Sequence, residues 1–363
     1  MNTLPGEPDY AVNVPTKSKR LATIQRIHSI QKHPNEEVEK LVVGKILEWP
    51  VVIPKGQYSE GELVVFIAID SIVPESNPYF EFMRKQKFRI WNARFKGAPS
   101  SGLVCPLSIL DHQPASERLE GYIVAHEWAE EGMDVTEKLG ITKYERPLDT
   151  SVRGDAAGNF PTSLISISDE DNMLSYSKAL LELEGKEFYV TEKVDGSSTT
   201  FIYNEGEFKA CSRRFELKEG SGFPWLVAAK YDIKNKLATL GRNLAIQAET
   251  IGPKMNGNTM GLKELEIRVF RIKDLNTRTI LGHHELIELC HQLQLPMVHV
   301  IEIRKFDKDV HTVEYFRQLT DRRVWDTNKQ PAEGLVVAPL IPFYSPLIEK
   351  EWSLKIINQN YRQ

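Results

Sequence analysis

The first 110 residues alternate between short apolar runs and turn-forming residues. Three runs are rich in β-branched and apolar side chains: Leu41–Leu47, Glu62–Asp70 and Gly102–Leu107. Pro54-Lys55-Gly56 and Ser59-Glu60-Gly61 separate the first two, and such residues typically form turns between strands. Several short strands in roughly 100 residues favour a small barrel, so we expect an OB-like β-barrel here.

The second half mixes two periodicities. Strand-like runs cover Glu187–Thr191, Thr199–Tyr203 and Ile267–Ile272, and helical patterns cover Leu226–Leu240 and His283–Leu293. Strands and helices do not alternate regularly, which favours an α+β fold with antiparallel sheets over a doubly wound sheet.

One further helix is predicted from its start signal. A hydroxyl N-cap at Ser168 precedes an acidic first turn, Asp169–Asp171, and the helix should run towards Leu183.

A small, polar and glycine-containing stretch lies between the two halves. Residues 148–160 have no apolar period and carry Gly154 and Gly158. That composition is typical of a linker. We therefore expect an OB-like domain over residues 1–147, a linker over 148–160 and a mixed α/β domain over 161–363.

Composition and charge exclude several classes of protein. The chain has 363 residues, 41% hydrophobic and 26% charged, and no run approaches the roughly 20 apolar residues of a membrane helix. Residues 1–10 show no signal-peptide pattern, and the three cysteines, Cys105, Cys211 and Cys290, are far apart. We expect an intracellular protein, cytoplasmic or nuclear rather than secreted, with no membrane partner. The oligomeric state is not set by the sequence, and a monomer is the simplest expectation.

Lys193-Val194-Asp195-Gly196 is the first motif that indicates chemistry. Alone it is a weak signal, because Asp-Gly is also a common hairpin dipeptide after a strand. Further elements follow it in order: Ser212-Arg213, Gln247-Ala248-Glu249 with Ile251–Asn258 after it, Val269-Phe270-Arg271-Ile272, Glu333-Gly334-Leu335-Val336-Val337 and Ser353-Leu354-Lys355.

This ordered set resembles the covalent nucleotidyltransferases, the superfamily of polynucleotide ligases and mRNA capping enzymes. Within it, the chain looks most like the ATP-dependent RNA ligases that carry an N-terminal OB-like domain. The resemblance covers about residues 160–363 as the nucleotidyltransferase domain and, more loosely, residues 20–145 as the accessory domain.

The resemblance implies a lysine nucleophile. Lys193 would attack the α-phosphorus of ATP, form lysyl-AMP and pass the AMP to a 5′-phosphate RNA end, which a 3′-hydroxyl then attacks. For this attack the amine must be largely deprotonated, so the pKa of Lys193 must be lowered by its surroundings or by a nearby metal. Arg213 and Lys355 match the cations that stabilise phosphate charge; the alternative for both is a solvated surface cation.

The resemblance also assigns the carboxylates. Asp195, Glu249 and Glu333 would hold Mg²⁺ or Mn²⁺ through water, and together with Lys193 and Lys355 make up the catalytic set. The nucleotide-binding set is Glu192, Lys193, Gly196, Arg213, Glu249, Phe270, Glu333 and Lys355. Phe270 would stack on adenine or belong to the core, and Glu192 can equally be a solvated strand-end carboxylate.

Three positions depart from the family pattern. Ala248 stands where glycine is usual, and Arg271 where an acidic residue is common. Ile357 stands at the spacing of a second lysine, which puts the second phosphate contact in doubt.

The net charge of −4 hides a local basic cluster. Six cations fall within thirteen residues that contain no acid: Arg84, Lys85, Lys87, Arg89, Arg94 and Lys96. Phe88, Trp91 and Phe95 are interleaved with them. Cations that contact phosphates and aromatics that stack on bases suit an RNA-binding surface. The alternative is an amphipathic segment with core aromatics and solvated cations.

Three functional hypotheses follow. The first is an ATP-dependent RNA ligase acting on broken or nicked RNA. The second is another lysyl-nucleotidyltransferase, a DNA ligase or capping-type enzyme; those place an OB domain after the last lysine motif, whereas only eight residues follow Lys355 here. The third is a non-catalytic RNA-binding protein on a ligase fold.

Overall fold

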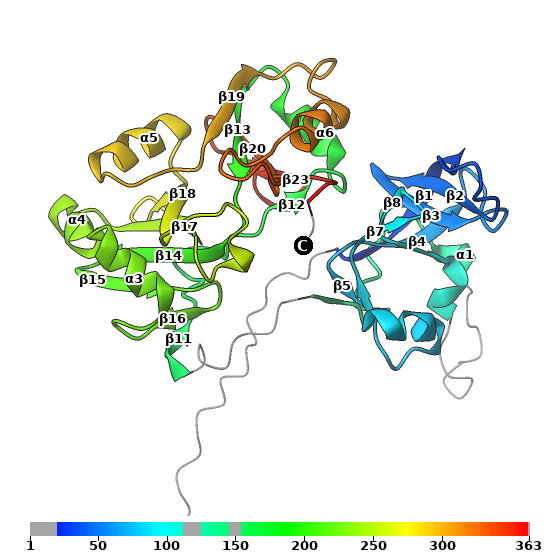
Figure 1. Ribbon diagram of the computed structural model, residues 1–363, viewed down its shortest axis with the longest axis horizontal. Coiled ribbons are helices and arrows are strands. Elements are labelled where there is room, and N and C mark those ends of the chain that lie inside the picture. The colour runs from blue at the N-terminus through cyan, green and yellow to red at the C-terminus, as the bar shows by residue number, and fades with distance from the viewer. Residues whose placement is uncertain (1–19, 112–124, 145–153, 362–363) are drawn as a thin grey trace, which may run out of the picture. The chain divides into compact units, whose positions relative to one another are not determined.

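The chain folds into two compact units, and the computed structural model describes residues 20–111, 125–144 and 154–361 (Figure 1). The division between the units falls at Pro147 and Leu148. Residues 1–10 and the first part of the predicted linker, 148–153, lie outside the described residues. Among the described residues, no helix is long and apolar enough to span a membrane.

The first unit is built from short strands around one long strand. Its elements are β1 (Ala22–Lys32), β2 (Leu41–Ile46), β3 (Trp49–Pro54), β4 (Leu63–Ile67), β5 (Ser71–Ile72), η1 (Pro78–Gln86), β6 (Arg89–Ile90), β7 (Asn92–Phe95), β8 (Ala98–Ser101), β9 (Leu103–Pro106), η2 (Leu107–Asp111), α1 (Ala125–Trp128) and β10 (Thr142–Lys143). The largest sheet has the order β3-β2-β1-β4-β9. The three strands expected from the apolar runs are present as β2, β4 and β9.

Strand β1 serves two neighbours. Its first half, up to Arg26, pairs with β4 and its second half, from Ile27, pairs with β2, and the register with β2 has an irregularity between Ile27 and Ser29. Such a bulge bends a strand. Ile24 and Ile67 from the sheet and Phe80 from η1 are buried in the core of this unit.

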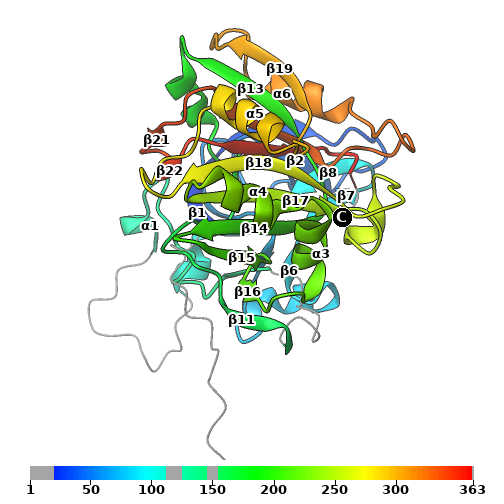
Figure 2. The ribbon, with the colours of Figure 1, turned by 90° about the vertical axis from the view of Figure 1, so that its left-hand side faces the viewer.

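The second unit consists of two main sheets. The six-stranded sheet has the order β11-β16-β15-β14-β17-β18, which Figure 2 shows as successive rows below α5, and the five-stranded sheet has the order β12-β23-β20-β13-β19. The strands are β11 (Ala156–Asn159), β12 (Asp171–Asn172), β13 (Glu187–Lys193), β14 (Ser197–Asn204), β15 (Glu207–Cys211), β16 (Phe215–Leu217), β17 (Leu244–Ile251), β18 (Glu266–Asp274), β19 (Val300–Lys305), β20 (Gly334–Pro339), β21 (Tyr344–Ser345), β22 (Lys350–Glu351) and β23 (Leu354–Ile357). Except for β12 with β23, the pairs within these sheets are antiparallel, so the predicted α+β class is confirmed.

Helices complete the second unit. They are η4 (Ser177–Leu183), α3 (Gly222–Lys230), α4 (Ile233–Leu240), η5 (Asn256–Asn258), α5 (His283–Gln292) and α6 (Val313–Asp321). Side chains of α3, α4 and α5 share one core with β14, β17 and β18. The predicted helix over 226–240 is two helices, because Asp232 takes a left-handed conformation with φ of 51° between them.

Two local predictions were wrong. The segment after Ser168 does not begin a helix: Asp171 and Asn172 form β12 beside β23, and a 3-10 helix starts only at Ser177. Pairing with β23 satisfies backbone groups that a helix would otherwise satisfy, so tertiary contact overrides the capping signal. The predicted linker also ends early, because residues 156–159 form β11 and pair with β16.

Candidate active site

The Lys193 motif crosses from one sheet to the other. Lys193 ends β13 in the five-stranded sheet, and β14 of the six-stranded sheet begins at Ser197. Val194 between them is buried against Ile251 and Trp325. The connection therefore holds the lysine at the place where the two sheets come together.

Glu333 reaches Lys193 because of strand register. Lys193 is paired with Gly334 in the β13–β20 ladder, and Glu333 directly precedes that glycine. Lys193 Nζ donates a hydrogen bond to Glu333 Oε1. The Lys193 side chain is 24% exposed and that of Glu333 only 7%, so the pair is largely shielded from water.

Two glycines allow this close packing. A Cβ on Gly196 would lie 2.2 Å from the Thr250 carbonyl oxygen and 3.0 Å from Glu249 Cγ. A Cβ on Gly334 would lie 2.2 Å from the Ile356 carbonyl oxygen. Gly196 therefore lets β17, which carries Glu249, lie close to the Lys193 motif. Gly334 lets β23, which carries Lys355, lie close to the start of β20.

The charges around Lys193 alter the pKa values of the site. Burial by itself lowers the pKa of Lys193, but Glu333, then Glu249 and Asp195, outweigh it and raise that pKa above its ordinary value. The protein surroundings by themselves therefore do not lower the Lys193 pKa, because three carboxylates surround the amine. Burial, with Glu333 and Asp195 nearby, raises the pKa of Glu249 to about 8 against an attraction to Lys193. Burial likewise raises the pKa of Glu333.

Asp195 is held at both oxygens. Asn256 Nδ2 donates to Oδ1 at 2.7 Å, and the Tyr361 hydroxyl donates to Oδ2. Asn256 also donates to the Gly196 carbonyl oxygen. The carboxylate is thus fixed from two segments distant in the chain.

The two predicted phosphate cations converge on one acid. Arg213 Nη2 lies 3.4 Å from Asp169 Oδ2, and Lys355 Nζ lies 3.5 Å from Asp169 Oδ1. The side chain of Arg213 is 46% exposed, so the pair is open to an anionic ligand on one side.

The next two acids are paired as well. Arg271 lies 3.0 Å from Glu170, and Lys350 lies 2.8 Å from Asp171. Burial would raise the pKa of Glu170, but the cations, Arg271 first, lower it below its ordinary value. Arg271, the departure from the family pattern, is thus accommodated by Glu170.

Other predicted nucleotide-binding residues border this centre. Glu192 accepts a hydrogen bond from Arg323, so it is not a solvated strand-end carboxylate. Phe270 is half-buried and packs against the apolar cluster that contains Val194. Its stacking on adenine stays a prediction.

The carboxylates also suit a divalent cation held through water. Glu333 Oε2 is buried and has no hydrogen-bond partner among the described residues. No group of three or more acid, histidine or cysteine side chains in 20–111, 125–144 and 154–361 forms a ready set of direct metal ligands. An orphaned buried oxygen beside Glu249 and Asp195 fits an ion whose water ligands bridge to these acids.

The basic cluster of the first unit divides into two groups. Arg84 is ion-paired with Glu75 and Glu81, and the Arg89 guanidinium lies 3.5 Å from the ring centre of Tyr144. The other four cations, Lys85, Lys87, Arg94 and Lys96, lie on the surface, fully or partly exposed.

The aromatics divide in the same way. Phe88 is buried in the core, whereas Trp91 and Phe95 are 42% and 48% exposed. Phe82 on η1 is exposed as well. The core interpretation therefore holds for Phe88 alone, whereas Trp91 and Phe95 lie on the surface, and RNA binding by this segment stays a prediction.

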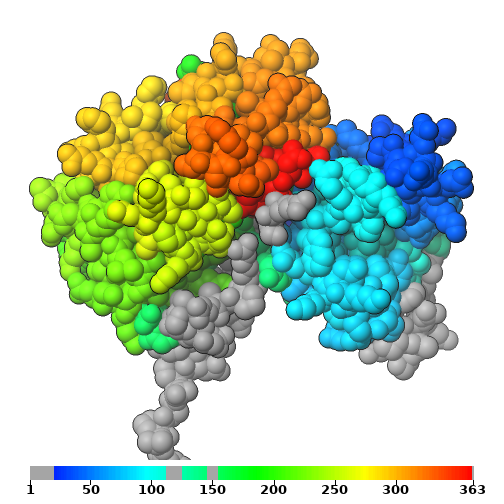
Figure 3. Space-filling model, in the orientation of Figure 1, coloured from blue at the N-terminus to red at the C-terminus, as the bar shows by residue number. Residues whose placement is uncertain are grey.

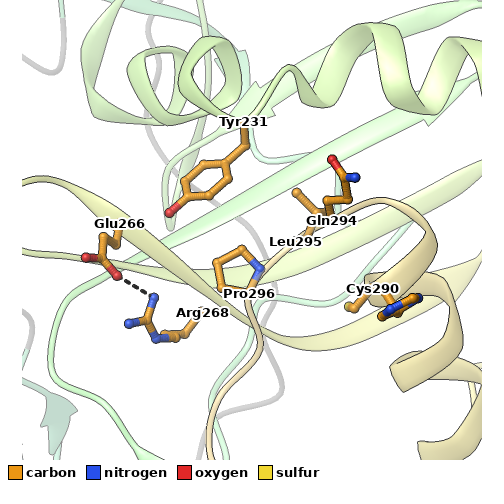
Figure 4. Close-up of a pocket in the computed structure, with 8 residues that line it drawn as sticks. Tyr231, Glu266, Arg268, Cys290, Gln294, Leu295 and Pro296 are labelled. Carbon is orange, nitrogen blue, oxygen red and sulfur yellow. Dashed lines mark ion pairs between the residues drawn. The ribbon is translucent and has the colours of Figure 1, made fainter.

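A separate hollow lies in the second unit. It has a volume of about 620 Å³ and is lined by Tyr231, Glu266, Arg268, Gln294 and neighbours (Figure 4). Glu266 and Arg268 form an ion pair of 2.7 Å at its wall. None of the predicted site residues lines it.

Reasoning from the sequence misses several site residues: Asp169, Glu170, Asn256, Arg323 and Tyr361. The acidic run 169–171 does carry a signal, but that signal predicts a helix start. Asn256 lies in the segment Ile251–Asn258 of the ordered set, but nothing there predicts its contact with Asp195. Tyr361 has no local signal and meets Asp195 only through the fold.

The second unit places a part-buried lysine among carboxylates where two sheets meet, and it follows a small β-unit, as the resemblance to polynucleotide ligases implies. Residues 186–355 match the family model for RNA ligase, and residues 21–107 match a model for an OB-fold domain. The chain belongs to the RNA ligase family, and the predicted OB-like domain is confirmed.

Solved structures agree with this assignment. The Naegleria gruberi RNA ligase with PPi is 30% identical, with a TM-score of 0.78, over 94% of this chain and 97% of that one. A lysine-to-alanine variant of the same ligase with ATP and Mn is 30% identical, with a TM-score of 0.78, over 93% and 97%. A glutamate-to-alanine variant with AMP and Mn is 30% identical, with a TM-score of 0.78, over 94% of this chain and 97% of that one. A search of the curated proteins found no significant match.

Proposed function

We propose that this protein is an ATP-dependent RNA ligase that works through a covalent Lys193–AMP intermediate. The observation that carries the proposal is the buried Lys193–Glu333 pair, flanked by Glu249 and Asp195 and lying in the same unit as Arg213 and Lys355. Family membership and the ATP and Mn in the Naegleria ligase structures support ATP and a divalent metal as requirements.

The first step joins Lys193 to AMP. Lys193 Nζ gives its proton to Glu333, to which it already donates a hydrogen bond, and the amine attacks the α-phosphorus of ATP. An N–P bond forms and the P–O bond to the β-phosphate breaks. The amine loses its second proton as the phosphoramide forms, and the pyrophosphate carries that proton away as it leaves. A bound divalent cation would supply positive charge against the phosphate oxygens and favour the neutral amine.

The second and third steps use the same centre. A 5′-phosphate oxygen of RNA attacks the AMP phosphorus, the N–P bond breaks, and Lys193 takes back a proton. A 3′-hydroxyl then attacks the RNA 5′-phosphorus and loses its proton to solvent, the bond from that phosphorus to AMP breaks, and AMP leaves as the phosphodiester forms. In all three steps Arg213 and Lys355 would exchange Asp169 for phosphate oxygens.

The first unit is the proposed RNA-binding part. Its surface cations Lys85, Lys87, Arg94 and Lys96, with Trp91 and Phe95, form a surface suited to phosphates and bases. An intracellular compartment is also proposed, supported by three cysteines that are buried and free.

The test is covalent labelling with α-labelled ATP and Mn²⁺ or Mg²⁺, followed by denaturation. We expect label on the wild type and on Lys305→Ala, an exposed lysine of β19, and none on Lys193→Ala. Absence of label on folded, AMP-free wild-type protein with either metal would reject the proposal. Label from GTP and not ATP would instead indicate a capping-type enzyme.

A further inference from the structure

The residues after β23 turn back onto the lysine site. Asn358 is 1% exposed, and its backbone N–H donates to the Glu333 carbonyl oxygen at 2.9 Å. Its side-chain Nδ2 donates to the Arg323 carbonyl oxygen at 3.3 Å. Asn358 therefore links this segment to the two residues that pair with Lys193 and Glu192.

A second set of contacts fixes the segment to the end of α6. The Gln359 N–H donates to Asp321 Oδ1 at 3.0 Å, and the Asn360 N–H donates to Asn358 Oδ1 at 2.9 Å. In Figure 3 the red C-terminal residues lie against the orange residues that follow α6. Residues 358–361 are thus held in place by hydrogen bonds as part of the second unit.

These contacts carry Tyr361 to the catalytic motif. Its N–H donates to the Asn358 carbonyl oxygen at 3.1 Å, and its hydroxyl donates to Asp195 Oδ2.

We infer that Tyr361 is a positioning residue for Asp195, and this inference rests on the proposed function. With Asn256 on the other oxygen, the two donors fix the orientation of the carboxylate. A carboxylate oxygen has about two lone-pair sites, so each oxygen keeps one for a water held by a divalent cation. Tyr361 thereby presents Asp195 in the orientation that binding of such an ion requires.

The consequence is a loss of metal affinity when the hydroxyl is removed. Changes to residues that orient metal-binding groups typically cost roughly 10- to 100-fold in metal affinity or activity. Tyr361→Phe removes only the oxygen and keeps the ring in place. Asn256→Ala removes the donor to the opposite oxygen and should act in the same direction.

The matched control is Tyr315→Phe. The Tyr315 hydroxyl also donates to a carboxylate, Glu302, at 2.8 and 2.9 Å, but that pair belongs to α6 and β19. Losing it tests what any part-buried tyrosine–carboxylate bond contributes to the fold. Thermal unfolding of all variants without metal measures that contribution.

The experiment uses the full chain with two readouts. Equilibrium binding of Mn²⁺ is measured in the presence of an ATP analogue that cannot be cleaved between the α- and β-phosphates. The rate of labelling by ATP is then measured against Mn²⁺ concentration. For Tyr361→Phe and Asn256→Ala we expect a dissociation constant and a half-saturating Mn²⁺ concentration roughly 10- to 100-fold higher, with Tyr315→Phe unchanged.

Two outcomes would reject the inference while leaving the ligase proposal intact. One is a wild-type Mn²⁺ dependence for both variants. The other is an equal loss in Tyr315→Phe. Failure of the wild type itself to label would reject the proposed function instead, so the two failures are distinguishable.

Discussion

Lys193 and Glu333 are 140 residues apart in the chain and meet because Lys193 faces Gly334 across the β13–β20 ladder. The strand register thus brings the candidate nucleophile to its carboxylate partner. In the absence of nucleotide this contact keeps the amine protonated, since the carboxylates raise its pKa. Lys193 can therefore act as a nucleophile only once its amine has lost this proton.

The pH dependence of stability should report Glu249. Its pKa is raised from 4.5 to about 8 in the folded protein, so the folded state binds a proton that the unfolded state has lost. In metal-free protein the stabilisation from this proton is complete below about pH 4.5 and is lost as pH rises towards about 8. We expect the stability of the wild type relative to Glu249→Gln to fall over that range in chemical denaturation. A constant difference across it would contradict the assignment.

Asp169 should compete with phosphate for Arg213 and Lys355. For Asp169→Asn we expect tighter ATP binding, because opposite charges near 4 Å attract by about 1 kcal/mol in water, or about five-fold in affinity. Calorimetry with a non-cleavable ATP analogue measures it. Asp274→Asn, whose partner is Arg242, is the control. Weaker binding would mean that Asp169 orders the cations instead.

Gly196 should tolerate no side chain. In Gly196→Ala the Cβ would meet the Thr250 carbonyl oxygen at 2.2 Å, so β17 and Glu249 must shift. We expect a loss of about 1–3 kcal/mol in stability and little labelling with ATP. Gly158→Ala, where nothing lies within 4 Å of the added Cβ, should behave as wild type. Normal labelling by Gly196→Ala would show that the close approach is dispensable.

Variants of the proposed RNA-binding surface should distinguish the contribution of charge to RNA affinity from that of stacking. Replacing Lys85, Lys87 and Lys96 by alanine should weaken binding of single-stranded RNA. It should also make the slope of log affinity against log salt concentration shallower by about 0.7 for each phosphate that is no longer neutralised. Phe95→Ala should cost about 1–3 kcal/mol of binding free energy with an unchanged slope. Fluorescence anisotropy at several salt concentrations distinguishes them.

Self-adenylation serves as the internal control for this surface. All these variants should label with ATP like the wild type, because the lysine site lies in the other unit. Arg84→Gln should have a smaller effect on RNA binding, since Arg84 is paired with Glu75 and Glu81. If the variants of Lys85, Lys87 and Lys96 lost labelling with ATP, the proposal that the first unit binds RNA and the second reacts with ATP would be rejected.

The sequence by itself determined the class of fold and the order of the motifs, because apolar runs and short motifs are properties of local segments. It assigned a role to Lys193 only through a resemblance to a family. The contact between Lys193 and Glu333 was not predicted, because it depends on the register of β13 with β20.

Only the tertiary structure decided which polar residues serve that centre. Asp169 meets Lys355 across 186 positions, and Tyr361 meets Asp195 across 166. It also placed Asp171 and Asn172 in β12, where the sequence predicted the start of a helix. It buried Phe88, because Lys87 and Phe88 both take positive φ and interrupt the regular alternation of inward and outward side chains. The physical reason is common to all of these: a charge, a hydroxyl or a ring has no fixed partner in its own segment, and the packed chain supplies one.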